Sequence, residues 1–119
     1  MKNFLYGYIN PNSKPRFALG RVVATPGAIE LMQRTETNPF ALLGRHVTGD
    51  WGECDPEDAQ TNEDALTHGS RVLSVYRLPL RAAGEKGDTQ SQADLTGDRI
   101  WVITEADRSV STLLLPEEY

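Results

Sequence analysis

The chain has 119 residues, of which 39% are hydrophobic and 24% charged, and its formal net charge is −5. This size and balance fit one globular domain with its own core, and they exclude a chain that is disordered throughout. The charge is uneven, because residues 1–25 contain four basic residues and no acidic one, whereas residues 26–70 carry two arginines against nine acidic residues. An acidic chain of this kind is poorly suited to neutralising DNA phosphates, so a protein partner is expected rather than direct nucleic-acid binding.

The sequence also predicts a cytoplasmic protein. Cys54 is the only cysteine, so an internal disulfide cannot form, which fits a reducing compartment. Glycine, asparagine and proline interrupt the N-terminal segment before any long apolar run, which argues against a signal peptide. No apolar stretch has the length that a membrane span requires.

Residues 1–18 are predicted to form an N-terminal aromatic arm or an edge strand. Phe4, Tyr6 and Tyr8 alternate, which would place three rings on one face of a strand. The segment Asn10–Pro15 then interrupts regular structure. Three rings left in water would form a patch that needs a partner, so they are candidate binding residues.

The next predicted elements are a strand and two short helices. The strand lies at Leu19–Ala24, and it leads to a helix that begins at Pro26 with Thr25 as its cap. The pair Asn38-Pro39 repeats this combination of a cap residue and a proline, which predicts a second helix. Apolar residues recur at helical spacing in both segments, so each helix should bury one face in the core.

The central segment combines a turn, a third helix and a strand. Two glycines flank Trp51, and a large aromatic side chain in such a turn anchors the turn on the core or, alternatively, forms an exposed binding residue. Asp55 is the predicted cap of an acidic helix at Pro56–His68, and Gly69 supplies its left-handed stop. A strand is predicted to follow at Arg71–Leu78.

The C-terminal part contains a loop and a β-hairpin. The segment at about residues 80–98 lacks apolar periodicity, which predicts a long mobile loop. Arg99–Glu105 is rich in β-branched and aromatic residues, and Val110–Leu115 is its natural antiparallel partner. Residues 19–119 should therefore form a single α+β domain. Its three- to four-stranded, mainly antiparallel sheet would end in a C-terminal meander and be covered on one face by three short helices.

Four short motifs stand out along the chain: VVATPG from Val22, HVTGDWG from His46, ITEADRS from Ile103, and the terminal LLPEEY. Together they resemble a family of small bacterial proteins of unknown function that occur on plasmids and other mobile elements. Members are sometimes labelled "plasmid-related protein" or "type I restriction endonuclease subunit". The resemblance covers about residues 19–119 and implies no established activity, but residence on a mobile element would suit a protein that blocks a host defence system.

A catalytic alternative depends on polar residues beside turns. A histidine with nearby carboxylates is the minimum set for general acid–base chemistry, as in a small hydrolase or nuclease. The residues available for it are His46, Asp50, Glu105, Asp107 and Arg108. However, a histidine and an aspartate four residues apart near a helix end more often form a local hydrogen bond, and the other three residues are typical of a hairpin turn.

No metal or cofactor is expected. The acidic residues lack the alternation and the central glycine of an EF-hand loop, and two histidines with one cysteine are too few for a structural zinc site. There is also no phosphate loop, dinucleotide-binding motif or nucleophile elbow.

The acidic segment is the stronger indication of function. Seven acidic residues and no basic residue lie between Asp50 and Asp64. This run either forms a solvated helix face or imitates a row of phosphates toward a nucleic-acid-binding partner. We therefore predict a non-enzymatic interaction protein, such as an anti-CRISPR or antirestriction inhibitor of a nucleic-acid-targeting defence complex. The candidate binding residues are Trp51, Glu53, Glu57, Asp58, Glu63 and Asp64, together with Phe4, Tyr6 and Tyr8.

Overall fold

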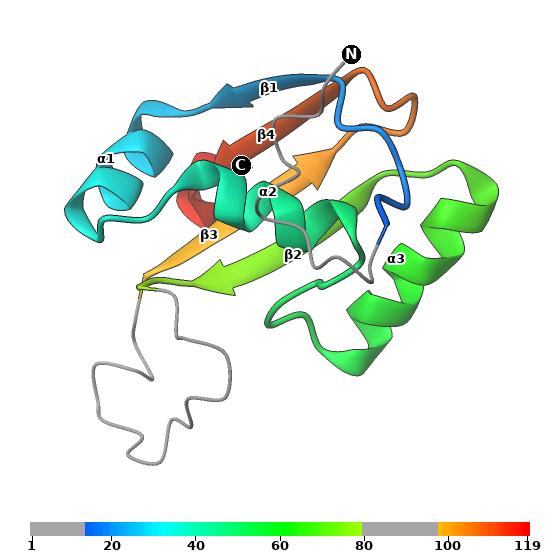
Figure 1. Cartoon of the computed structure of the whole chain (residues 1–119). Coiled ribbons are helices and arrows are strands. Elements are labelled where there is room, and N and C mark those ends of the chain that lie inside the picture. Colours follow the sequence, from blue (N-terminus) through cyan, green and yellow to red (C-terminus); the bar gives the residue numbers. More distant parts are fainter. Residues whose placement is uncertain (1–13, 80–97) are drawn as a thin grey trace.

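The computed structural model describes residues 14–79 and 98–119, so the predicted aromatic positions Phe4, Tyr6 and Tyr8 and nearly all of the predicted 80–98 loop lie outside the described residues. Three α-helices and a four-stranded sheet form the described part of the chain, which confirms the predicted α+β class (Figure 1). In chain order the elements are β1 (Arg21–Ala24), α1 (Pro26–Arg34), α2 (Pro39–Val47), α3 (Pro56–His68), β2 (Val72–Arg77), β3 (Arg99–Thr104), β4 (Val110–Leu114) and the 3₁₀ turn η2 (Pro116–Glu118).

The sheet has the strand order β1-β4-β3-β2. The pairs β2–β3 and β3–β4 are antiparallel, which confirms the predicted C-terminal meander. The first strand joins this meander by pairing parallel to β4, with Val22 opposite Ser111. As a result, β1 and β2 form the two edges of the sheet.

Local sequence signals explain where the helices begin and end. The side chains of Thr25, Asn38 and Asp55 accept hydrogen bonds from first-turn amides of α1, α2 and α3, and a proline follows each cap. Gly69 ends α3 with a φ of 74°, a left-handed conformation that glycine adopts without steric cost. The predicted starts of all three helices and the stop of α3 are confirmed.

The main core lies between the helices and one face of the sheet. Figure 1 shows α2 crossing this face and α3 lying beside β2. None of the helices in the described parts of the chain has the length and apolar character needed to cross a bilayer. The largest fully buried apolar side chains of this core are Leu31, Leu42, Leu43, Tyr76, Ile100 and Leu113.

The segment before β1 packs against the end of α2 and the middle of α3. The Arg16 guanidinium pairs with Glu63 at 2.8 Å. The Phe17 ring lies edge-on to His46 and stacks on Trp51, with centroid distances of 5.1 and 6.3 Å. The contacts of the domain therefore extend upstream of β1 to Arg16.

Candidate functional site

His46 belongs to a chain of hydrogen bonds inside the domain. Its side chain is fully buried, with Nδ1 2.6 Å from Ser74 Oγ and Nε2 2.9 Å from Thr104 Oγ1. Thr104 Oγ1 lies 2.6 Å from Ser111 Oγ, which donates to the Leu19 carbonyl at 2.8 Å. These contacts connect α2 with β2, β3, β4 and the segment before β1.

The final acceptor in this series of hydrogen bonds is the Leu19 carbonyl, and it determines where each proton lies. A carbonyl only accepts, so Ser111 donates to Leu19 and must accept from Thr104. Thr104 has then used its only proton and accepts from Nε2 of His46, while Nδ1 accepts from Ser74. Burial lowers the pKa of His46 to about 3, with the positive charge of Arg108 as a second cause. The ring is therefore neutral near pH 7, and both of its nitrogens are occupied.

Two of the three carboxylates of the catalytic alternative are engaged elsewhere. Asp50 is exposed and pairs with Arg45 at 2.8 Å, while Asp107 accepts hydrogen bonds from Ser109, which lower the pKa of Asp107. Glu105 is exposed at the β3–β4 turn. In the part of the chain that the structure describes, no hydrogen bond joins His46 to any of these carboxylates. The set does not form an acid–base pair.

Arg108, the remaining member of that set, has a structural position. Its guanidinium donates to the carbonyls of Ser70 and Ala65, at 2.6 and 3.3 Å, and so satisfies groups at the end of α3. It also lies over the Phe17 ring, 5.5 Å from the centroid. These contacts occupy the side chain that was available to stabilise a developing negative charge.

Several of the predicted binding residues also make contacts within the domain. Trp51 is only 6% exposed, as expected for an anchor, and its indole N–H donates to Glu63 at 3.0 Å. The hydrogen bonds from Arg16 and Trp51 lower the pKa of Glu63. Glu53 pairs with Arg77 and Arg99, at 3.1 and 3.5 Å.

The remaining acidic candidates are exposed on α3. They are Glu57 and Asp58 in its first turn and Asp64 near its middle, where Asp64 accepts a hydrogen bond from Gln60. Within residues 14–79 and 98–119, no three His, Cys, Asp or Glu side chains are placed to hold a metal ion. The acidic surface thus contains fewer free carboxylates than the sequence count indicated.

The two edges of the sheet differ in a way that the sequence did not predict. At the β2 edge, the Val75 amide donates to Trp51 and its carbonyl accepts from Glu53, at 3.1 and 2.6 Å. The Asn62 side chain bonds to both the carbonyl and the amide of Leu73, at 2.6 and 3.0 Å. Neighbouring residues therefore cover this edge. Natural proteins commonly cover edge strands in this way, which prevents unwanted strand pairing.

Among residues 14–79 and 98–119, no strand covers the outer edge of β1, which we call open. The Arg21 amide donates to the Ser109 carbonyl, in the turn before β4, at 2.9 Å, and the Thr25 amide donates to the Leu113 carbonyl of β4 at 3.0 Å. Successive residues of a strand direct their amides to opposite sides, so Val22 and Ala24 point their N–H and C=O groups away from β4. No other strand of the described chain lies on that side.

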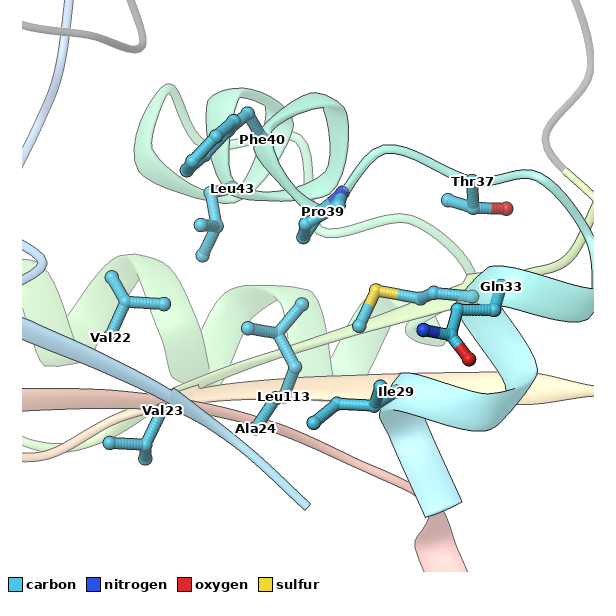
Figure 2. Close-up of a pocket in the computed structure, with 11 residues that line it drawn as sticks. Val22, Val23, Ala24, Ile29, Gln33, Thr37, Pro39, Phe40, Leu43 and Leu113 are labelled. Carbon is cyan, nitrogen blue, oxygen red and sulfur yellow. The ribbon is translucent and has the colours of Figure 1, made fainter. Parts of the chain in front are cut away.

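An apolar pocket of about 550 Å³ lies beside this open edge, between β1, α1 and α2 (Figure 2). Three large apolar side chains are exposed in the described residues, and two of them, Val23 and Ile29 at 37% and 44%, belong to residues that border this pocket, although the Val23 side chain points to the other face of β1. We call the outward-facing backbone of Val22 and Ala24, together with this pocket, the β1 site. Other residues that line the pocket are Met32, Phe40, Leu43 and Leu113.

Comparison of the sequence with protein-family models and with curated proteins, and of the fold with solved structures, found no match. The β1 site is therefore interpreted from its own chemistry. An open edge offers backbone donors and acceptors, and an adjacent apolar pocket offers space for a side chain. This combination is suited to an extended polypeptide that adds a strand to the sheet.

Proposed function

We propose that the protein is a non-enzymatic interaction module that binds an extended segment of a partner protein at the β1 site. The observation that supports this proposal is the position of the pocket directly beside the outward-facing backbone of Val22 and Ala24. Backbone hydrogen bonds along the edge would supply affinity, and the pocket would select the side chain that enters it. The covered β2 edge makes β1 the edge at which this can occur.

For the partner, we propose a nucleic-acid-targeting defence complex in the cytoplasm, which the protein would inhibit as an anti-CRISPR or antirestriction factor. Two observations support this class. The first is the resemblance to mobile-element proteins, and the second is the exposed acidic group of Glu57, Asp58 and Asp64 on α3. Complementary charge mainly accelerates the encounter with a basic surface. Since α3 packs on β2, at the sheet edge opposite to β1, each surface can be altered without changing the other.

Selection of random linear peptides on the immobilised full-length protein tests the binding mode. We expect the selected peptides to slow hydrogen exchange at the amides of Val22 and Ala24. The variant Ala24→Pro removes one outward N–H but leaves the hydrogen bonds from β1 to β4 in place, and we expect it to weaken binding about tenfold. The variant Ala24→Ser keeps this N–H and is the matched control.

A second variant tests the pocket independently of the backbone. Ile29 is exposed, so Ile29→Glu should leave the fold intact while placing a charge at the entrance of the pocket. We expect this variant to lose binding, and Ile29→Ala to retain most of it. If no peptide is selected, or if selected peptides protect amides on α3 and not those of β1, the proposed function is wrong.

A further inference from the structure

We infer that the partner segment lies antiparallel to β1 and carries three apolar residues followed, toward its C-terminus, by an acidic residue. This inference rests on the proposed function, because it specifies the ligand of the β1 site. It is argued from the four positions of β1, each of which faces one residue of the incoming strand.

The hydrogen-bonding groups of the edge favour the antiparallel direction. In an antiparallel pair, a residue whose N–H and C=O both point to its neighbour exchanges both bonds with the residue opposite. Val22 and Ala24 have this orientation, so each would form such a pair. Parallel pairing would use the same groups with slanted and less stable bonds.

The side chains opposite Val22 and Ala24 should be apolar. Residues directly opposite each other in a sheet place their side chains on the same face. Val22 points to the face that α2 covers, and Leu43 of α2 faces it across the pocket (Figure 2). Ala24 is small, so the residue opposite it has the most space and should be large and apolar.

Val23 points to the other side of β1 (Figure 2). Its side chain is 37% exposed, and the strand residue opposite would cover it. A β-branched residue packs well against another one across a pair of strands. The third apolar position of the ligand is therefore the one opposite Val23, between the two positions that face the pocket.

Arg21 specifies the acidic position. Its side chain is exposed, and in the described part of the chain none of the ion pairs includes it. It shares the face of Val23, so an acidic residue opposite Arg21 would form a cross-strand ion pair. In the antiparallel direction this residue follows the three apolar ones.

The position opposite Arg21 also indicates whether the partner is a different protein or a second copy of this chain. If two β1 strands paired antiparallel about Val23, Thr25 of one copy would lie opposite Arg21 of the other, with no carboxylate to meet it. Two chains would also approach each other with a net charge of −5 each. Charge complementarity therefore favours a partner that supplies the acidic residue.

Synthetic peptides test this inference on the full-length protein. The probe has three β-branched apolar residues followed by glutamate, with threonines at both ends, and its binding is measured by fluorescence anisotropy. We compare it with a peptide that has lysine in place of glutamate, using the wild-type protein and the charge-reversal variant Arg21→Glu. We expect the glutamate peptide to bind about three- to fivefold more tightly than the lysine peptide on the wild type, and this preference to reverse on Arg21→Glu.

A peptide with the reversed order, glutamate first, is the control for direction. Tighter binding of this peptide would overturn the antiparallel arrangement, and equal binding of the glutamate and lysine peptides to both proteins would overturn the acidic position. In either case, peptides selected from the random library that still protect Val22 and Ala24 would leave the proposed function standing. Sedimentation of the free protein tests whether the partner is a second copy of this chain. A dimer that is present in the wild type and dissociates in Ala24→Pro would overturn the inference.

Discussion

The side-chain amide of Asn62 donates to the Leu73 carbonyl at 2.6 Å and accepts from the Leu73 amide at 3.0 Å. A neighbouring strand would otherwise provide these two hydrogen bonds. Asn62 is 3% exposed, so both backbone groups are paired in an environment that largely excludes water. The amide therefore completes the β2 edge and fixes α3 on it at the same time.

The variant Asn62→Ala should lower the free energy of unfolding by about 2 kcal/mol, because it leaves the part-buried Leu73 amide without this partner and the Leu73 carbonyl with only the weak hydrogen bond from the Cys54 thiol. The measurement is urea denaturation followed by circular dichroism. Gln60→Ala on the same helix removes an exposed amide that donates to Asp64, and it should change the midpoint little. Similar losses in the two variants would show that the Asn62 contact contributes no special stability.

The buried His46 predicts a loss of stability in acid. In the folded protein its pKa is about 3, and in the unfolded chain it returns to its ordinary value of about 6.5. Between these two values the unfolded state binds more protons, so the stability contributed by this group falls as the pH falls, by up to about 1.4 kcal/mol per pH unit. Comparing urea midpoints at several pH values between 7.5 and 5 tests this effect.

The variant His46→Gln should reduce this pH dependence, although it also lowers stability at neutral pH because it disrupts the contacts with Ser74 and Thr104. His68→Gln changes an exposed histidine and should retain the pH dependence of the wild type. An unchanged slope in His46→Gln would show that His46 is not the group responsible.

The cap of α3 gives a third prediction. Asp55 Oδ1 accepts a hydrogen bond from the Asp58 amide at 2.7 Å, so Asp55→Ala should lower stability by about 1 kcal/mol. Asparagine is an equally good cap, and Asp55→Asn should cost much less. Equal denaturation midpoints for the wild type and Asp55→Ala would contradict the assignment of Asp55 as the cap.

The acidic residues of α3 should divide into two groups. Glu63→Lys breaks the bond to Trp51 and places a like charge beside Arg16, so it should lower stability by about 1 kcal/mol and alter Trp fluorescence. Asp64→Lys, on the exposed face, should have a smaller effect on both. If the two variants have the same stability and the same Trp fluorescence, Glu63 belongs to the solvated face of α3.

Much of the fold could be predicted from local signals. The cap-and-proline pairs fix the helix starts, and Gly69 fixes the end of α3, because these residues act on backbone groups within one turn. The hairpin of β3 and β4 is likewise a short-range pairing. The strands predicted at Leu19–Ala24 and Arg71–Leu78 are present, with ends one or two residues shorter.

The position of the candidate site could not be predicted in the same way. Whether β1 is a central or an edge strand depends on its pairing with β4, about 90 residues later in the chain. His46 lies beside a polar turn in the sequence, but its partners Ser74 and Thr104 are 28 and 58 residues away. Such contacts exist only after the elements have packed, and no local pattern encodes them.

The difference between the two edges also sets the valency of the protein. A sheet with two open edges can add a strand on each side, and successive additions can grow into a chain of molecules. Here Asn62 and the segment around Trp51 occupy the β2 edge, so strand addition is restricted to β1. Under the proposed function, each molecule would therefore accept one strand, and a complex formed in this way should stop growing at one copy of the protein per partner segment.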